Sequence, residues 1–235
     1  MVQEMVRQWA QELKEFNYST WLSTVVMIAL LMLGGVNVRK WYVASREQKA
    51  QFAMSEAFEE YDRAVLRMVE SKESDDQVAK QQLEDAHLSF DVVLRNHGSS
   101  ALSGCAYAFE ADIYWYENKK AEALVAMENA IKRAPKSPLA YEWKTKLALM
   151  KLDAERVEEG VAELNALARD PKNITADRAS FELGYYYWCA KDEAHARDAW
   201  QLLEKFSGSK QGDELQQTVS PYLALAQMKL SAISE

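Results

Sequence analysis

Residues 175–206, TADRASFELGYYYWCAKDEAHARDAWQLLEKF, carry the clearest structural signal in the sequence. Gly184 and Tyr187 stand in the first half of this stretch, and Ala196 and Trp200 stand in the second half. Small residues let two helices approach closely, and a large ring about one turn away fills the space beside the contact. The stretch therefore predicts two antiparallel helices joined by a short turn.

The same kind of hairpin precedes this one twice. Proline, glycine or serine residues interrupt the pattern at steps of about 35 residues, which is the period of tetratricopeptide repeats. The expected helix pairs are 101–117 with 119–134, 138–152 with 155–169, and 175–190 with 193–206. Because such hairpins stack on their neighbours, the sequence predicts an all-α fold, a tetratricopeptide-repeat-like α-solenoid of antiparallel helix hairpins.

The two earlier hairpins depart from the repeat pattern at charged residues. Glu110 stands where a large apolar residue is expected, and Lys144 and Lys151 occupy positions that are usually apolar. Small residues that permit close packing are kept, as at Ala111 and Gly160. We therefore expect one regular repeat, one intermediate repeat and one degenerate repeat.

Further helices are expected on both sides of the repeats. A long helix over 45–71 should pack on a partner helix over 77–96. Its apolar stripe consists of Met54, Phe58, Tyr61, Val65 and Met68. A last helix over 213–233, begun or kinked by Pro221, is expected to cap the array, because a final repeat would otherwise expose an apolar face.

Residues 21–42, WLSTVVMIALLMLGGVNVRKWY, predict a single transmembrane anchor. About twenty residues of helix rise roughly 30 Å, the thickness of a bilayer's hydrocarbon core. Trp21 at one end, and Trp41 with Tyr42 at the other, match the aromatic residues found at membrane interfaces. A buried core helix is the alternative. A cleaved signal peptide is disfavoured, because acidic residues precede the segment and no A-x-A site follows it.

These elements predict four divisions of the chain. They are an amphipathic N-terminal segment (1–20), the transmembrane anchor (21–42), a long helix with a first hairpin (43–99), and the repeats with their capping helix (100–235).

Charge and motifs exclude several classes of function. The chain has 36 acidic and 28 basic residues, a net charge of −8, which argues against binding to nucleic acid. It has no G-x-S-x-G, glycine-rich phosphate loop or H-E-x-x-H motif, so we expect no catalytic residues, metal or cofactor. We expect His87, His97 and His195 at the surface or at helix ends. We expect Cys105 and Cys189 to be free thiols packed within helices.

Aromatic residues are dense in two of the predicted first helices, at 114–116 and 185–188. Successive helical residues are turned by about 100°, so three consecutive rings cannot all point into the core. Exposed aromatic side chains are frequent anchors at protein interfaces. The predicted protein-binding groove on the first helices comprises Asp112, Trp115, Tyr116, Arg178, Phe181, Tyr185 and Trp188. The alternative is that these rings pack against a neighbouring first helix or the capping helix.

The chain as a whole resembles the YfgM-like ancillary subunits of the bacterial SecYEG translocon. The similarity is carried by RKWYVASREQKAQFAMSEAFEEYDRAV (39–65), ARDAWQLLEKFS (196–207) and PYLALAQMKLSAI (221–233), and by the order of the elements. The resemblance implies a single-pass protein of the bacterial inner membrane whose repeats face the periplasm. It also implies Sec translocon subunits and a membrane-anchored periplasmic chaperone or prolyl isomerase as partners.

Two alternatives remain open from the sequence. Basic residues are more frequent after the anchor (Arg39, Lys40, Arg46, Lys49) than before it (Arg7, Lys14), and the positive-inside rule would therefore place the repeats in the cytoplasm. The chain could also be a repeat scaffold of another envelope complex, for secretion, division or motility. In either case the sequence predicts a membrane-anchored protein-binding scaffold and not an enzyme.

Overall fold

The computed structural model describes residues 18–70, 77–135, 137, 139–209 and 220–233. Side-chain surroundings are described for these residues except 18–36, 204–209 and 232–233. Contacts divide the chain into two units, Met1–Lys49 and Ala50–Glu235.

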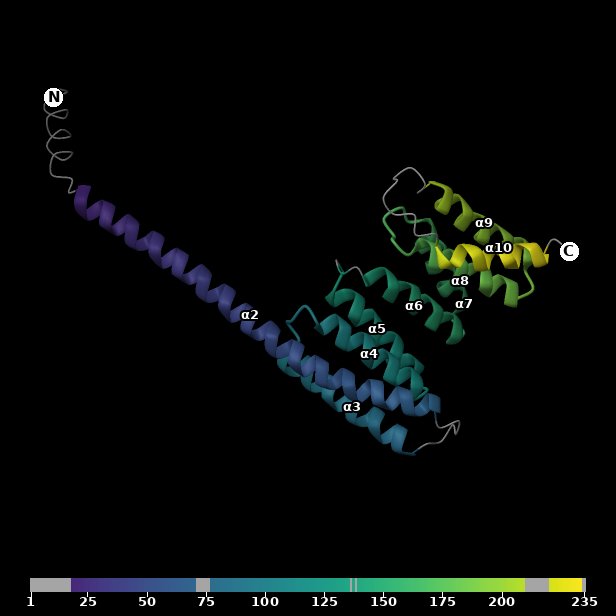
Figure 1. Cartoon of the computed structure of the whole chain (residues 1–235), viewed down its shortest axis with the longest axis horizontal. Helices are drawn as coiled ribbons and strands as arrows, with labels where there is room; N and C mark the ends of the chain where they lie inside the picture. Colours follow the sequence, from purple (N-terminus) through teal and green to yellow (C-terminus); the bar gives the residue numbers. More distant parts are fainter. Residues whose placement is uncertain (1–17, 71–76, 136, 138, 210–219, 234–235) are drawn as a thin grey trace, which may run out of the picture. The chain divides into compact units, whose positions relative to one another are not determined.

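The described part of the chain is all-α and forms sequential antiparallel hairpins, so the predicted class of fold is confirmed in this form. Figure 1 shows α4 beside α5 and α8 beside α9, each pair joined by a short turn. The helices are α2 (Tyr18–Glu70), α3 (Gln77–His97), α4 (Ser103–Tyr116), α5 (Lys120–Arg133), α6 (Ala140–Asp153), α7 (Val157–Arg169), α8 (Ala176–Cys189), α9 (Glu193–Ser209) and α10 (Pro221–Ile233).

The turns inside the three repeats share one backbone conformation. Asn118, Glu155 and Lys191 each have a positive φ, of 60°, 65° and 62°. Each follows the first helix of its hairpin, and the amide after Lys191 donates a hydrogen bond back to the carbonyl of Tyr187 at 2.9 Å. This left-handed residue ends one helix and reverses the chain into the next.

The contact of small and large residues predicted between α8 and α9 is confirmed. Ala196 and Trp200 are fully buried, and a Cβ atom added at Gly184 would lie 2.7 Å from Trp200 Cε2. The Trp200 indole also donates a hydrogen bond to the carbonyl oxygen of Phe181 at 3.2 Å. Glycine at position 184 therefore makes room for the tryptophan that joins the two helices.

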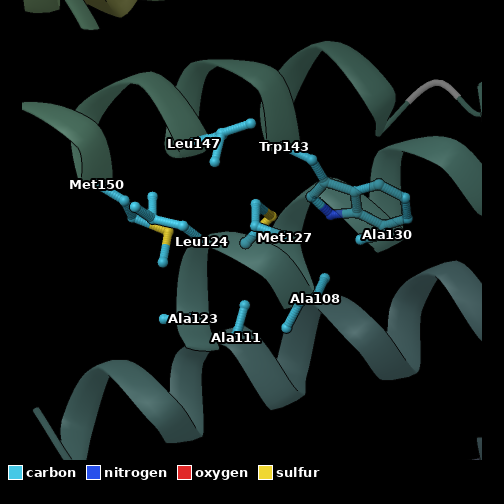
Figure 2. Close-up of a cluster of buried hydrophobic side chains, with 10 residues drawn as sticks. Ala108, Ala111, Ala123, Leu124, Met127, Ala130, Trp143, Leu147 and Met150 are labelled. Atoms are coloured by element: carbon cyan, nitrogen blue, oxygen red, sulfur yellow. The ribbon is translucent and has the colours of Figure 1, made fainter. Parts of the chain in front are cut away.

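Small residues also line the contact between α4 and α5, where α6 covers them. In Figure 2, alanines of α4 and α5 face the larger Leu124 and Met127, while Trp143, Leu147 and Met150 approach from α6. Met127 is fully buried in this cluster. One hydrophobic core thus joins the second hairpin to the third.

The Ala50–Glu70 part of α2 packs on α3 and α4 through a stripe that differs from the predicted one. Met54 is buried as expected, but Phe58 is exposed and the alanines Ala57 and Ala64 are buried in its place. Phe58 instead touches Phe109 of α4 edge-on, with ring centroids 5.4 Å apart. Small residues of α2 therefore form its contact with α3 and α4.

The C-terminal helix packs on the last hairpin, as predicted for a cap. Pro221 begins α10, and Ala226 is fully buried against Trp200 and Leu203 of α9. The predicted residues 213–219 of this helix lie outside the described part of the chain.

The predicted anchor lies mostly outside the residues whose side chains are described. The backbone is helical from Tyr18, and Trp41 and Tyr42 are exposed. Within the described residues, no helix combines the length and the apolar character that crossing a membrane requires. The predicted N-terminal segment, 1–20, is outside the described residues up to residue 17.

Both cysteines are free thiols, but their surroundings differ. Cys105 is partly buried, whereas Cys189 is exposed at the end of α8, so the expectation of two packed thiols is wrong for Cys189. Cys189 is the last residue of α8.

Candidate protein-binding surface

Ion pairs connect the first helices of successive hairpins. Lys146 of α6 pairs with Asp112 of α4, and Glu142 of α6 pairs with Arg178 of α8. Arg178 also lies 3.9 Å from Glu182, one turn along α8. Two residues of the predicted groove, Asp112 and Arg178, are thus part of a row of charges that crosses from α4 to α8.

This row is partly desolvated at both its α4 end and its α8 end. Burial raises the pKa of Asp112, and the Lys146 ammonium opposes the rise. Burial likewise raises the pKa of Glu182, with Arg178 opposing it. Both carboxylates are thus partly withdrawn from water, and each has a cationic neighbour that favours its charged form.

Tyr116 lies at the α4 end of this row and is 53% exposed. Tyr116 lies near Tyr61 of α2. Burial, the Asp112 charge and Tyr116 together raise the pKa of Tyr61. The structure thus brings Asp112 and Tyr116 together around Tyr61.

At the other end of the row, α10 covers two of the predicted groove residues. The Phe181 ring lies 5.5 Å from that of Tyr222, and Lys229 Nζ lies 3.6 Å from the centroid of Trp188. Tyr185 stands between these rings, 6.4 Å from Phe181 and 6.0 Å from Trp188, and is 44% exposed. Packing against the cap, the alternative considered above, applies to Phe181 and Trp188 but leaves Tyr185 open.

Trp115 is partly buried. It packs against the core shared by α4, α5 and α6, and Lys120 Nζ lies 5.6 Å from its ring centroid. The same ammonium donates a hydrogen bond to the carbonyl oxygen of Asp153 at 2.6 Å. A binding role for the seven groove residues remains a prediction, but only Tyr116 and Tyr185 offer exposed rings.

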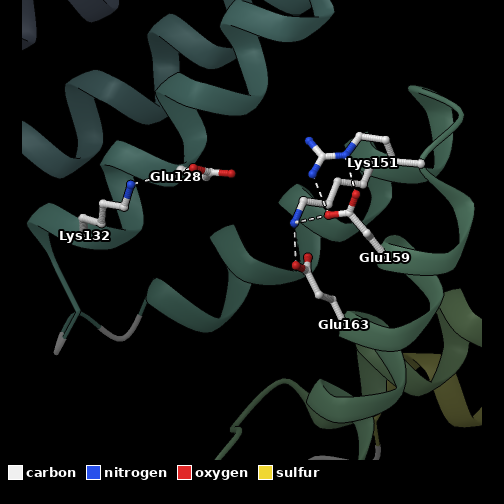
Figure 3. Close-up of polar contacts among 6 residues, drawn as sticks. Glu128, Lys132, Lys151, Glu159 and Glu163 are labelled. Atoms are coloured by element: carbon white, nitrogen blue, oxygen red, sulfur yellow. Dashed lines mark hydrogen bonds and ion pairs between the residues drawn. The ribbon is translucent and has the colours of Figure 1, made fainter.

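A pocket of about 440 Å³ opens between α5, α6 and α7. Its floor is apolar, and its rim carries lysines and glutamates from all three helices. Figure 3 shows Glu128 and Lys132 of α5 across this space from Lys151 and its partners. The lining consists of Glu128, Ile131, Lys132, Lys144, Leu147, Lys151, Glu163, Ala166 and Leu167.

Lys151 is 5% exposed and is neutralised within this pocket. Its Nζ atom lies 2.5 Å from Glu163 Oε1 and 3.7 Å from Glu159 Oε2 (Figure 3). The Arg156 guanidinium and Lys151 lower the pKa of Glu159. The sequence did signal this pocket, because Lys144 and Lys151 replace the apolar residues that would have filled it.

Within the described residues, no group of three or more His, Cys, Asp or Glu side chains could hold a metal ion.

Comparison with known proteins supports the fold. No established protein family matches the sequence, and no curated protein matches it. The chain is similar to the crystal structure of BtubC (BKLC) from P. vanneervenii, with a TM-score of 0.50 and 17% sequence identity over 81% of each chain. At this identity the similarity concerns the fold alone. The chain therefore has a tetratricopeptide-like helical-repeat fold.

Proposed function

We propose that this chain is a membrane-tethered scaffold that binds protein partners beside the bacterial Sec translocon. The proposed partners are translocon subunits and a membrane-anchored periplasmic chaperone or prolyl isomerase. The fold supports the scaffold part of this proposal, and the resemblance carried by 39–65 and 221–233 supports the choice of partners. Tethering would raise the effective concentration of the repeats near the translocon.

The observation that carries the proposal is the pair of exposed tyrosines at the two ends of one row of charges. Tyr116 and Tyr185 belong to α4 and α8, which α6 links through its ion pairs with Asp112 and Arg178. Tyrosine combines a large apolar ring with a hydrogen-bonding hydroxyl, and it is enriched among residues that dominate binding energy. A partner that lies along α4, α6 and α8 would contact both rings.

Site-specific crosslinking tests this surface. A photo-crosslinking amino acid at position 116 or 185 should capture Sec subunits or periplasmic folding factors, which mass spectrometry identifies. The same amino acid at Glu158, an exposed residue of a second helix, is the control. Capture from position 158 alone would contradict a binding surface on the first helices. Capture of division or motility proteins from 116 and 185 would favour the second candidate, a scaffold of another envelope complex.

The anchor and the periplasmic location belong to the same proposal. Cys189 is exposed and provides a natural probe of orientation. A thiol reagent that cannot cross the inner membrane should label it after the outer membrane of intact cells is permeabilised, and C189S should abolish the signal. Labelling only after lysis of the inner membrane would place the repeats in the cytoplasm, as the flanking basic residues suggest.

A further inference from the structure

A second pocket, of about 390 Å³, lies between α4 and α5. Its size is within the range of pockets that hold small ligands or a partner's side chain. The polar and aromatic side chains in its lining are Tyr107, Glu110 and Tyr114 from α4 and Glu122 and Asn129 from α5. Both acidic groups and both rings favour a positively charged occupant.

Glu110 is the unusual member of this lining. Its residue is 7% exposed, and among the described residues no side chain or backbone group donates a hydrogen bond to it. Burial raises the pKa of Glu110 to about 7, and no cation in the described part of the chain opposes this rise. A carboxyl group withdrawn from water without a partner is costly, and most buried carboxylates in proteins are paired.

Among the described residues, one neighbour of Glu110 comes within ion-pair distance, but none donates a hydrogen bond to it. The Nδ1 atom of His87, on α3, lies 3.9 Å from Glu110 Oε1, within ion-pair distance when the imidazole is protonated but too far for a hydrogen bond. That nitrogen is itself buried without a hydrogen bond in the structure, and the ring rests against Tyr114. His87 lies within α3 and is partly buried, so the expected surface or helix-end position is wrong for it.

The charges on the α5 side do not reach Glu110 either. Lys119, just before α5, pairs with Glu117 at 2.9 Å, and its ammonium lies 5.9 Å from the ring of Tyr114. Glu122 of α5 adds a second negative charge to the pocket. The pocket therefore presents carboxylates and two phenol rings, and its buried carboxyl, Glu110, accepts no hydrogen bond from the described residues.

We propose that this pocket receives a basic side chain, lysine or arginine, from a protein partner, with the cation pairing to Glu110 and lying against Tyr107 and Tyr114. The inference rests on the proposed function, because the basic side chain belongs to the bound protein. Carboxylates form strong charge-assisted hydrogen bonds with ammonium and guanidinium groups, and aromatic faces attract both cations. An uncharged apolar side chain would fill the same space but leave Glu110 unpaired.

The proposal can be tested by measuring the proton that Glu110 releases when a cation binds. A group with a pKa near 7 is partly protonated at neutral pH, so binding of a cation displaces its proton to solvent. Calorimetric titration of the full-length chain at pH 7 in two buffers of different ionisation enthalpy measures that proton. The probe is N-acetyl-lysine methylamide, and its neutral counterpart is N-acetyl-norleucine methylamide.

We expect the lysine probe to bind with release of a fraction of a proton and the norleucine probe to bind at least about tenfold more weakly. E110Q, which keeps the size of the side chain, should weaken the lysine probe about tenfold and abolish proton release. E158Q, an exposed carboxylate on α7, is the matched control and should change neither quantity. Because proton release is measured on the unchanged chain, the test does not depend on how E110Q folds.

Equal binding of the two probes, or lysine binding without proton release, would overturn the pocket's assignment. So would the absence of lysine binding at tens of millimolar. These outcomes differ from failure of the proposed function. A tethered chain that captures no envelope protein could still bind the lysine probe, and a Sec-associated chain could fail to bind it.

Discussion

At the scale of single residues, the contact between Gly184 and Trp200 sets how closely two helices can lie. A Cβ atom at position 184 would overlap the indole, which is fully buried and cannot swing away. We expect G184A to lower the free energy of unfolding by about 1–3 kcal/mol, the usual cost of overpacking. Urea unfolding of the full-length chain followed by circular dichroism measures this loss.

A double-mutant cycle separates steric overlap from a general effect of alanine. In a W200L background the indole is absent, so the added methyl group should cost much less. Equal losses in the two backgrounds would show that position 184 does not act through Trp200.

Glu110 predicts a specific dependence of stability on pH. Burial raises its pKa from the ordinary 4.5 to about 7, so the folded chain holds this proton more tightly than the unfolded chain. Its favourable contribution is complete below about pH 4.5 and is lost as the pH rises through 7. A shift of this size corresponds to a loss on the order of 3 kcal/mol.

The difference between the wild-type chain and E110Q isolates this effect from all other carboxylates. We expect the two unfolding free energies to be similar near pH 4.5 and E110Q to be the more stable at pH 8. A difference that does not change with pH would show that Glu110 ionises as freely in the folded chain as in the unfolded one.

At the scale of helices and turns, the repeat period and the small residues predicted the hairpins well. Gly184, Ala196 and Trp200 meet as the spacing indicated, because contacts inside one hairpin are local in sequence. The sequence could not predict in the same way which aromatic side chains of the first helices are covered by other helices. Phe181 and Trp188 are covered by α10, which begins at Pro221, and local spacing carries no information about such a distant partner.

The departures from the repeat pattern were visible but could not be interpreted from the sequence. Glu110 and the pair Lys144 and Lys151 were recognised as charged residues at apolar positions. Only the packed helices show that both sets line pockets, one between α5, α6 and α7 and the other between α4 and α5. A pocket is formed by residues that become neighbours only in the folded chain. The sequence shows only that a charged residue stands where an apolar one is expected.

The left-handed turn residue is an element-scale feature that the sequence did not predict. Lys191 has a φ of 62°, which costs a residue with a Cβ atom about 1 kcal/mol relative to glycine. We expect K191G to raise the free energy of unfolding by about that amount. A190G is the control, since Ala190 has an ordinary φ of −75°, where glycine should destabilise. If both variants are less stable than the wild-type chain, the backbone strain that glycine removes at position 191 is smaller than the conformational entropy that glycine adds to the unfolded chain.

At the scale of the whole molecule, stability in a repeat array comes from each hairpin and from its contacts with the next one. The core clusters pass from one hairpin to the next, as Figure 2 shows where α6 packs on α4 and α5. On the far side of the last hairpin, the described part of the chain contributes α10. Damage to α10 should therefore loosen α8 and α9 first and leave the earlier hairpins folded.

Ala226 provides the sharpest test of this division. It is fully buried against Trp200 and Leu203, so A226D would place a charge in an apolar contact and detach α10. We expect rapid proteolysis within α10, greater exposure of Trp188 to a fluorescence quencher, and a second, earlier thermal transition. A224D adds the same charge to a neighbouring exposed position of α10 and should keep the single transition. If A226D unfolds the entire chain at one lower temperature, the hairpins of Ala50–Glu235 form a single cooperative unit, and α10 stabilises the whole array through the contacts that pass from helix to helix.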